Sequence, residues 1–270
     1  MSLDATIPQV VDLTLWEDRA PSKGLPVDLG DVQRDWTKLG EDDPLWAVLI
    51  QPGTRGGRWD VDDFLATGRA EIDASLDHLR RLMPLPTLDR VLDFGSGAGR
   101  LSQALAAHAT SVVGVDISEP MIRTARRLDR SDRCEFVLNQ RSDLSVFDDE
   151  SFDLVYSSLV LQHMPLDVAL TFLREMSRVL RPGGALVVQV AATPTRSFKG
   201  WAFKYAPKPL LRWAQTRLLG YPAPMRMQAI TDQDFVGAVA GSLTVLDTVT
   251  DDTYGGHWVY HRHFAVKRTT

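Results

Sequence analysis

Three features of this chain have residue types and spacing suited to binding or transforming a small ligand. The first is a glycine-rich run over residues 93–99, Asp-Phe-Gly-Ser-Gly-Ala-Gly, which ends a short apolar stretch. Glycines at alternate positions let a backbone turn tightly and approach a ligand where a Cβ atom would collide. The second is Asp116, at the end of another apolar run, and the third is His163.

The carboxylate at the start of the glycine run indicates the charge of the ligand. A dinucleotide-binding loop has the pattern Gly-x-Gly-x-x-Gly, but here Gly99 comes one position early and Arg100 stands where the third glycine belongs. Asp93 would repel a pyrophosphate and attract an ammonium group. The run therefore predicts a cationic ligand, with a simple tight turn as the alternative. Asp116 could accept hydrogen bonds from both hydroxyls of a ribose, or cap the following helix.

Strand-like and helix-like patterns alternate from residue 90 onward, which predicts a parallel sheet with helices on both faces. A helical spacing of leucines over residues 61–82 precedes this region, and two further strand-like runs form a predicted terminal hairpin. The expected strands cover 90–94, 111–115, 135–138, 152–157, 185–190, 243–249 and 258–266, and the expected helices 101–108, 120–128, 166–180 and 232–240. Residues 1–60 are rich in Pro, Gly and Asp and predict irregular structure with short helices.

The composition is that of an ordinary globular chain. Of 270 residues, 44% are hydrophobic, and 30 basic against 35 acidic residues give a net charge of −5, which makes a nucleic-acid partner unlikely. The single cysteine, Cys134, excludes an internal disulfide and a cysteine-based zinc site. We find no apolar run long enough for a transmembrane segment and no signal-peptide pattern, so we expect a cytoplasmic protein.

The ordered set of motifs resembles the class I S-adenosylmethionine-dependent methyltransferases over residues 90–190. The motifs are Asp93–Gly99, Asp116, Phe-Asp-Leu-Val-Tyr-Ser at 152–157, Leu-Gln-His-Met at 161–164 and Leu-Arg-Pro-Gly-Gly at 180–184. The resemblance implies an α/β, Rossmann-like sheet of seven strands with helices on both faces and an antiparallel last strand. It also implies S-adenosyl-L-methionine as the cofactor.

The resemblance assigns the cofactor-binding residues. The methionine part would lie in a cradle of Asp93, Gly95 and Gly97, the ribose on Asp116, and the adenine between Ile117 and Met121. Many relatives carry Gly-Asp after the third strand, whereas this chain has Leu-Asn-Gln-Arg-Ser-Asp-Leu over residues 138–144. We therefore expect Asp143 and Leu144 beside the adenine, unless Asp143 is a solvated turn residue. Arg69 would pair with the cofactor's carboxylate, or serve only as a surface charge.

Methyl transfer to a hydroxyl requires removal of a proton, and histidine is the side chain best suited to this near neutral pH. His163 follows the predicted strand 152–157 at the ligand-binding edge of the sheet and is the candidate base. Its alternative role is to orient the loop or cap the next helix. We assign no metal ligands, although dispersed carboxylates could still form a magnesium site.

A basic, aromatic segment follows the fifth predicted strand. Residues 176–231 contain no Asp or Glu but many Arg, Lys, Trp and Tyr. We expect 196–231 to form a helical lid over the site, with Trp201 and Tyr205, together with Trp59 and His257, as acceptor-binding residues. The alternatives are a solvated helix, a subunit contact in a homodimer, a membrane-contacting surface and a single-stranded nucleic-acid site.

These features divide the chain into a helical N-terminal extension that covers the site (1–60), a cofactor-binding core (61–195), the lid (196–231) and the end of the core (232–270). The predicted function is O-methylation of a saccharide, an oligosaccharide or a similar polar small molecule, since the whole also resembles actinobacterial methyltransferases of sugars and polysaccharides. The alternatives are a methyltransferase of an aromatic or polyketide product, a lipid methyltransferase at the membrane surface, and a cofactor-binding scaffold without turnover.

Overall fold

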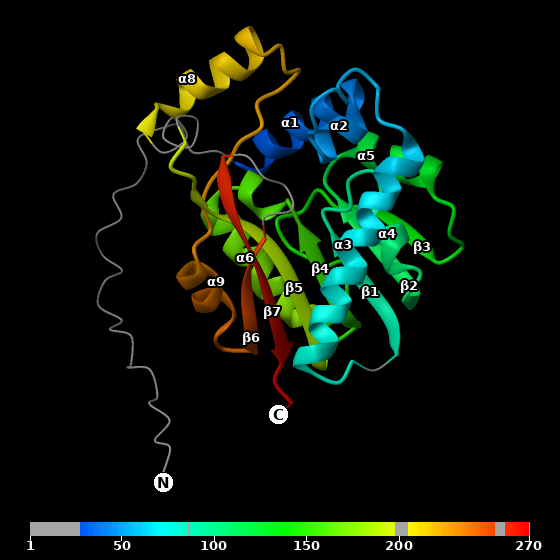
Figure 1. The fold of residues 1–270 in the computed structure, drawn as a ribbon. Coiled ribbons are helices and arrows are strands. Elements are labelled where there is room, and N and C mark those ends of the chain that lie inside the picture. The colour runs from blue at the N-terminus through cyan, green and yellow to red at the C-terminus, as the bar shows by residue number, and fades with distance from the viewer. Residues whose placement is uncertain (1–27, 86, 198–204, 252–256, 270) are drawn as a thin grey trace.

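One seven-stranded sheet organises the molecule (Figure 1). The computed structural model describes residues 28–85, 87–197, 205–251 and 257–269. The strand order is β3-β2-β1-β4-β5-β7-β6, in which β1 to β5 are parallel and β7 runs antiparallel to both β5 and β6. The strands are β1 (Leu88–Phe94), β2 (Ala109–Asp116), β3 (Cys134–Leu138), β4 (Phe152–Ser158), β5 (Leu180–Pro194), β6 (Leu243–Asp251) and β7 (Trp258–Lys267). The predicted sheet, including its terminal hairpin, is confirmed.

Helices cover both faces of the sheet, as the alternating pattern predicted. The two large apolar clusters separate the faces: one includes side chains of α3 and α4, the other those of α6 and α9. Strands β4 and β5 contribute to both clusters because they are buried on both sides. The helices are α3 (Val61–Leu82), α4 (Arg100–Leu105), α5 (Glu119–Leu128), α6 (Leu166–Val179) and α9 (Asp232–Val239), and η1 (Leu161–His163) is a short 3-10 turn after β4.

Two N-terminal helices lie above the edge of the sheet at which β1, β2 and β4 end. They are α1 (Leu29–Asp42), which starts at an Asp28 side chain that accepts the N–H of Asp31, and α2 (Pro44–Val48). Helices were expected in this N-terminal extension, and α1, at 14 residues, is longer than the short helices that the composition predicted. Its apolar residues recur at helical spacing, and burial of that face against α5 outweighs the local abundance of Gly and Asp.

The segment after β5 forms a helix that stands above α1 (Figure 1). It consists of α8 (Lys208–Trp213) followed directly by the π-helical turn η2 (Ala214–Leu218). A helical element was expected within 196–231, but the domain boundaries themselves stay predictions. Within the described ranges, none of the helices combines the length and apolar character needed to cross a bilayer.

Candidate functional site

The glycine loop joins β1 to α4 in a backbone shape that requires glycine. The amides of Gly95 and Ser96 both donate to the carbonyl oxygen of Val115, at 2.8 and 3.0 Å, which fixes the loop to the end of β2. Gly95 and Gly97 have φ values of +77° and +51°, in the left-handed region. A Cβ at Gly95 would lie 2.2 Å from Val160, so only a bare backbone fits there.

Asp93 is buried beneath this loop with half of its carboxylate unpaired. Its Oδ2 accepts a 2.6 Å hydrogen bond from Ser102, whereas Oδ1 has no hydrogen-bond partner among the described residues. Burial raises the pKa of Asp93 to about 7, although the Ser102 bond and the positive charge of Arg100 oppose the rise. A cation placed beside it would favour the ionised form.

Asp116 links the glycine loop to the start of α5. Its Oδ2 accepts the amide of Gly97 at 2.9 Å and its Oδ1 accepts the amide of Ser118 at 2.8 Å. Each carboxylate oxygen can accept more than one hydrogen bond, so capacity for a further donor remains. Burial raises its pKa, while the backbone hydrogen bonds oppose that shift. The carboxylate is thus held at a defined position for a ligand hydroxyl.

The glycine loop and Asp116 border a cavity at the carboxyl ends of β1, β2 and β4, whereas Asp93 is not among its lining residues. This is where open parallel α/β sheets bind ligands. The lining residues come from four places: α1 and α2, the glycine loop, the ends of β2 and β3, and the segment after β4. They are Leu29, Val32, Trp36, Val48, Phe94, Gly95, Ser96, Gly97, Arg100, Leu101, Val115, Asp116, Ile117, Asn139, Arg141, Ser158, Leu159, Val160, His163, Met164 and Phe172.

His163 lies in this cavity wall in a neutral, oriented form. Its Nδ1 is 2.6 Å from the carbonyl oxygen of Arg226, and because a carbonyl can only accept, Nδ1 carries the proton. The edge of the ring meets the ring of Trp36 at a centroid distance of 5.0 Å. Burial lowers the pKa of His163 to about 4, against the opposing effect of backbone carbonyls at Arg226 and Leu159. In this neutral tautomer the ring's lone pair lies on Nε2.

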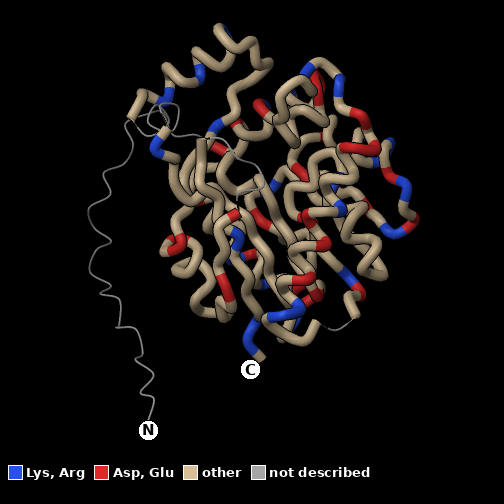
Figure 2. Tube along the Cα trace, in the orientation of Figure 1, with Lys and Arg blue, Asp and Glu red and all other residues tan. Residues whose placement is uncertain are grey.

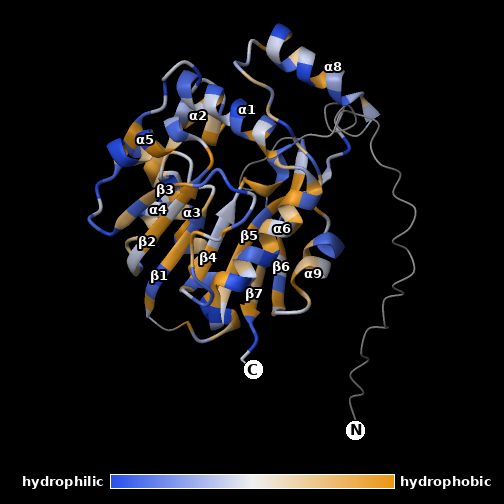
Figure 3. Cartoon of the chain, turned by 180° about the vertical axis from the view of Figure 1, so that it is seen from behind, coloured by the Kyte–Doolittle hydropathy of each residue, from blue (hydrophilic) through white to orange (hydrophobic). Residues whose placement is uncertain are grey.

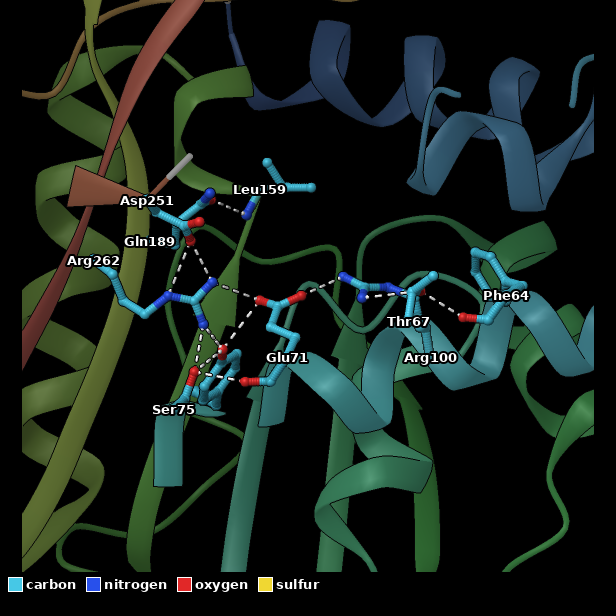
Figure 4. A network of polar contacts seen from close by, with 10 residues as sticks. Phe64, Thr67, Glu71, Ser75, Arg100, Leu159, Gln189, Asp251 and Arg262 are labelled. Atoms are coloured by element: carbon cyan, nitrogen blue, oxygen red, sulfur yellow. Dashed lines mark hydrogen bonds and ion pairs between the residues drawn. The ribbon is translucent and has the colours of Figure 1, made fainter. Parts of the chain in front are cut away.

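A buried polar network supports the loop from below (Figure 4). Nη2 of Arg100, the first residue of α4, donates to Glu71 of α3 at 2.8 Å. Glu71 also accepts from Tyr156 on β4 and from Arg262 on β7, both at 3.0 Å. Arg262 in turn donates to Asp251 at the end of β6. The network ties the glycine loop to three other strands, and a buried carboxylate needs such partners.

The structure brings together five of the predicted site residues at the cavity wall: Gly95, Gly97, Asp116, Ile117 and His163. Asp93 lies two residues before Gly95, at the end of β1, and is buried. The roles of these residues toward a ligand stay predictions.

Four predicted cofactor residues lie elsewhere. Arg69 is exposed on α3, and Met121 packs in a cluster with α1 and α2. Leu144 is fully buried in the core, and Asp143 accepts hydrogen bonds from the amide and hydroxyl of Ser145. None of the four is among the cavity-lining residues. Asn139 and Arg141 line the cavity where Asp143 and Leu144 were expected.

The predicted acceptor residues are dispersed. Trp59 packs edge-on against Phe64 and donates its Nε1–H to the carbonyl of Leu49, so it supports α2 and lies outside the lining. Tyr205 is 60% exposed, and the carbonyl of His257 accepts the amide of Thr195. Trp201 lies outside the described residues.

The sequence predicted an N-terminal extension over the site but did not identify the residues of α1 that line the cavity. Leu29, Val32 and Trp36 line the cavity, and their spacing, continued by Leu39, is that of one helix face. That periodicity, with Asp28 as the capping residue, was a sufficient signal. Arg100 also lines the cavity, but its partner Glu71 is 29 residues away on another helix, and no local pattern marks the pair.

The arrangement of strand, glycine loop and acidic strand ends agrees with a comparison against known families. Residues 92–188 match the family described as "Methyltransferase domain". Residues 92–188 form a methyltransferase domain. The matched range contains the glycine loop, Asp116 and His163, and it ends within β5.

Several curated methyltransferases resemble this chain in sequence. A demethylmenaquinone methyltransferase of Clavibacter sepedonicus is 43% identical over 39% of this chain and 42% of its own length. A 2-methyl-6-phytyl-1,4-hydroquinone methyltransferase of Synechocystis is 30% identical over 78% of this chain and 65% of its own. A 27-O-demethylrifamycin SV methyltransferase of Amycolatopsis mediterranei is 34% identical over 54% and 52%. The matches span about half of these relatives' length.

Solved structures share the fold. The magnesium protoporphyrin IX methyltransferase of Synechocystis with bound SAH has a TM-score of 0.61 and 21% identity, over 90% of this chain and all of that one. The [4+2]-cyclase SpnF has a TM-score of 0.52 and 19% identity, over 73% of this chain and 81% of that one. At these identities the likeness establishes the class I methyltransferase fold. The cyclase illustrates that the fold alone does not determine the reaction.

Proposed function

We propose that this protein is an S-adenosylmethionine-dependent methyltransferase that methylates a hydroxyl group. The observation that carries the proposal is one cavity with two parts: a glycine loop between Asp93 and Asp116, and a neutral histidine at the opposite wall. The methyltransferase domain over residues 92–188 and the curated relatives support the same reaction class.

The residues present fit this cofactor. The unpaired Oδ1 of Asp93 and its raised pKa suit a nearby ammonium or sulfonium charge. The held carboxylate of Asp116 suits a ribose diol, and Ile117 and Asn139 provide an apolar and a polar contact for a purine next to it. When bound, the cofactor supplies a methyl group on a positively charged sulfur.

His163 would act as the general base. With Nδ1–H donated to the carbonyl of Arg226, Nε2 can accept the proton of an acceptor hydroxyl while the oxygen attacks the methyl carbon. The Trp36 ring and the Arg226 carbonyl hold the imidazole in one orientation. Alignment of the two reactants by the cavity walls supplies the remainder of the rate enhancement.

The cavity wall favours an aromatic or polyketide-like acceptor over the predicted saccharide. All three lining residues of α1 are apolar, and Val160, Met164 and Phe172 extend this surface toward β4 and α6. A sugar needs hydrogen-bond partners for several hydroxyls. A flat apolar ring, in contrast, is stabilised when it leaves water and packs against such a wall. The relatives named above carry quinone, hydroquinone and rifamycin names. The saccharide, the resemblance to sugar methyltransferases, the cytoplasmic location and the homodimer stay predictions.

The test combines binding and turnover. Calorimetry should detect binding of S-adenosylmethionine and of S-adenosylhomocysteine. Tight binding of NADH, with no binding of either of these two compounds, would contradict the proposal. A panel of phenolic, quinol and saccharide acceptors with methyl-labelled cofactor then identifies the acceptor class. Label in a phenol or quinol supports the apolar assignment, and label only in a saccharide overturns it. Cofactor binding without S-adenosylhomocysteine formation under every acceptor would favour the scaffold alternative.

A further inference from the structure

The segment 205–219, which includes α8 and η2, carries most of the large exposed apolar side chains among the described residues. Nine such side chains are exposed in the described ranges, and five of them lie in this segment. We call these five, together with the exposed cations Lys208 and Arg217, the lid patch. The five are Tyr205 (60% exposed), Leu210 (53%), Trp213 (52%), Leu218 (68%) and Leu219 (56%). A group of this kind on a globular surface marks an interaction site.

The lid patch has one sign of charge. Residues 176–231 contain no acidic residue, and the exposed Lys208 and Arg217 lie among the apolar side chains. Figure 2 shows α8 with basic segments and no acidic ones, in contrast to the mixed signs on the body of the molecule. The partner of this surface should therefore be both apolar and anionic.

Described contacts anchor one side of the helix, and the five apolar side chains of the lid patch are each more than half exposed. Arg55, in the loop before α3, donates to the carbonyls of Leu219 and Gly220 and lies over the rings of Trp46 and Tyr221 at 5.0 and 5.2 Å. From both sides of the molecule, α8 is seen to stand out from the body (Figures 1 and 3). The exposed leucines and tryptophan are thus presented outward by an ordered support.

We propose that the lid patch binds the surface of an anionic lipid bilayer. A tryptophan and leucines can enter the boundary between headgroups and acyl chains while lysine and arginine remain at the phosphates. The helical stretch 208–218 is too short to span a bilayer, so it would lie in the plane of the surface. A protein partner would require complementary acidic and polar groups arranged to match, whereas a fluid bilayer accommodates this mixture without a fixed pattern.

The lid patch is connected to the candidate base through a short length of chain. Gln215 in η2 donates to the carbonyl of Met225, and the carbonyl of the next residue, Arg226, orients His163. Arg226 is itself paired with Asp35 of α1 at 2.7 Å. If the proposed function holds, the surface that docks on lipid is next to the apolar wall that receives the acceptor. An acceptor dissolved in the bilayer could then enter without crossing water.

The experiment measures sedimentation of the full chain with vesicles, which requires neither cofactor nor turnover. Vesicles of phosphatidylcholine alone are compared with vesicles in which a third of the lipid is phosphatidylglycerol. We expect binding to the anionic vesicles, at least about tenfold weaker binding to the neutral ones, and loss of binding as salt is raised. Absence of binding to both kinds, or equal binding to both, overturns the proposal.

Matched variants locate the surface. Leu210→Ser with Trp213→Ser should lower the partition coefficient about tenfold or more, and Val236→Ser, at an exposed apolar position on α9, should not. Arg217→Glu should weaken binding to anionic vesicles, and Arg127→Glu, exposed on α5, is its charge-matched control. Equal effects of patch and control variants overturn the assignment.

Two further readouts separate the alternatives. If the Leu210→Ser and Trp213→Ser variant dissociates a dimer in sedimentation velocity while vesicle binding is unchanged, the lid patch is a contact between copies and the proposal fails. S-adenosylhomocysteine formation with a water-soluble acceptor tests the proposed function separately. Vesicle binding without turnover rejects only the enzyme, and turnover without vesicle binding rejects only the membrane surface.

Discussion

The glycine-loop region and the lid region differ in how the chain secures them. The loop is fixed by backbone hydrogen bonds to Val115, by Asp116 and by the buried network around Glu71, all within or against the sheet. The lid helix is held by a few contacts, chiefly those of Arg55, and has no buried residue of its own. If the proposed function holds, the cofactor-binding residues lie in a rigid part of the molecule, whereas the element proposed to contact the bilayer is weakly attached.

The largest expected effect separates chemistry from cofactor binding. His163→Ala should lower kcat by about 10²–10⁴-fold, because the acceptor proton then has no base, and should change cofactor affinity little. Steady-state kinetics and calorimetry measure the two quantities. His108→Ala, whose ring pairs with Asp73 away from the cavity, is the control. Unchanged kcat in His163→Ala would remove this residue from the mechanism.

The next largest effect should be on cofactor affinity and should come from the glycine-loop region. Asp116→Ala should weaken cofactor binding roughly 10–100-fold, because a charged hydrogen-bond acceptor is lost and the amides of Gly97 and Ser118 lose their partner. Calorimetric titration with S-adenosylhomocysteine measures it. Asp148→Ala at an exposed position serves as the control. Full affinity in Asp116→Ala would contradict the ribose assignment.

The pH dependence of cofactor binding should identify Asp93. Since its pKa is raised to about 7 and the ionised form attracts a cation, affinity should rise about tenfold between pH 6 and 8. Asp93→Asn should abolish this rise. Ser102→Ala removes a hydrogen bond that lowers the pKa, so it should move the rise to higher pH. A pH-independent affinity in the unmodified protein would contradict the assignment.

Ionisation of Asp93 also affects the free energy of unfolding of the cofactor-free protein. This free energy should fall as pH rises, whereas the affinity for the cofactor should increase. The unfolded chain releases the Asp93 proton near pH 3.8, whereas the folded protein holds it up to about pH 7. The folded state therefore binds more protons in this window, and the contribution of Asp93 to the free energy of unfolding falls as pH rises through it. Denaturant unfolding of the unmodified protein and Asp93→Asn at several pH values measures the difference. His163, with a pKa lowered to about 4, should contribute in the opposite sense between pH 4 and 6.5.

The smallest expected effect concerns the lid region, through amide exchange and the KM for the acceptor. Arg55→Ala removes hydrogen bonds to Leu219 and Gly220 and the contacts with two aromatic rings, a loss of about 1 kcal/mol for the cation–π component. We expect faster amide exchange over residues 208–221 and a few-fold higher KM for the acceptor, with cofactor affinity unchanged. Arg58→Ala, exposed in the same loop, is the control. Equal exchange in both variants would show that Arg55 does not hold the lid.

The parts of the site that could be predicted from sequence are those fixed by local rules. A glycine loop between a buried strand and a helix, and a carboxylate at the next strand end, have one geometry in this fold, and Gly95, Gly97 and Asp116 lie at the cavity. Arg69 lies outside the cavity lining, because the direction of an exposed helical side chain depends on the rotation of α3 about its axis. That rotation is set by packing against β-strands distant in sequence.

The other misplacements have similar causes. Met121 and Leu144 are apolar, so each can either contact a ligand or be buried in a neighbouring apolar cluster. The structure places both side chains in such clusters. The apolar wall of α1 was missed because its composition was weighed above its periodicity. The pair of Glu71 and Arg262 spans 191 residues, and no local pattern can connect two such positions.

The position of β7 in the sheet has a consequence for biosynthesis. Strand β6 joins the sheet only through β7, which lies between it and β5. During synthesis β6 leaves the ribosome before β7. The backbone N–H and C=O groups of β6, and those on the edge of β5 that later pairs with β7, therefore have no strand partner until β7 inserts between them. In this interval both the open edge of β5 and the unpaired β6 are available to chaperones.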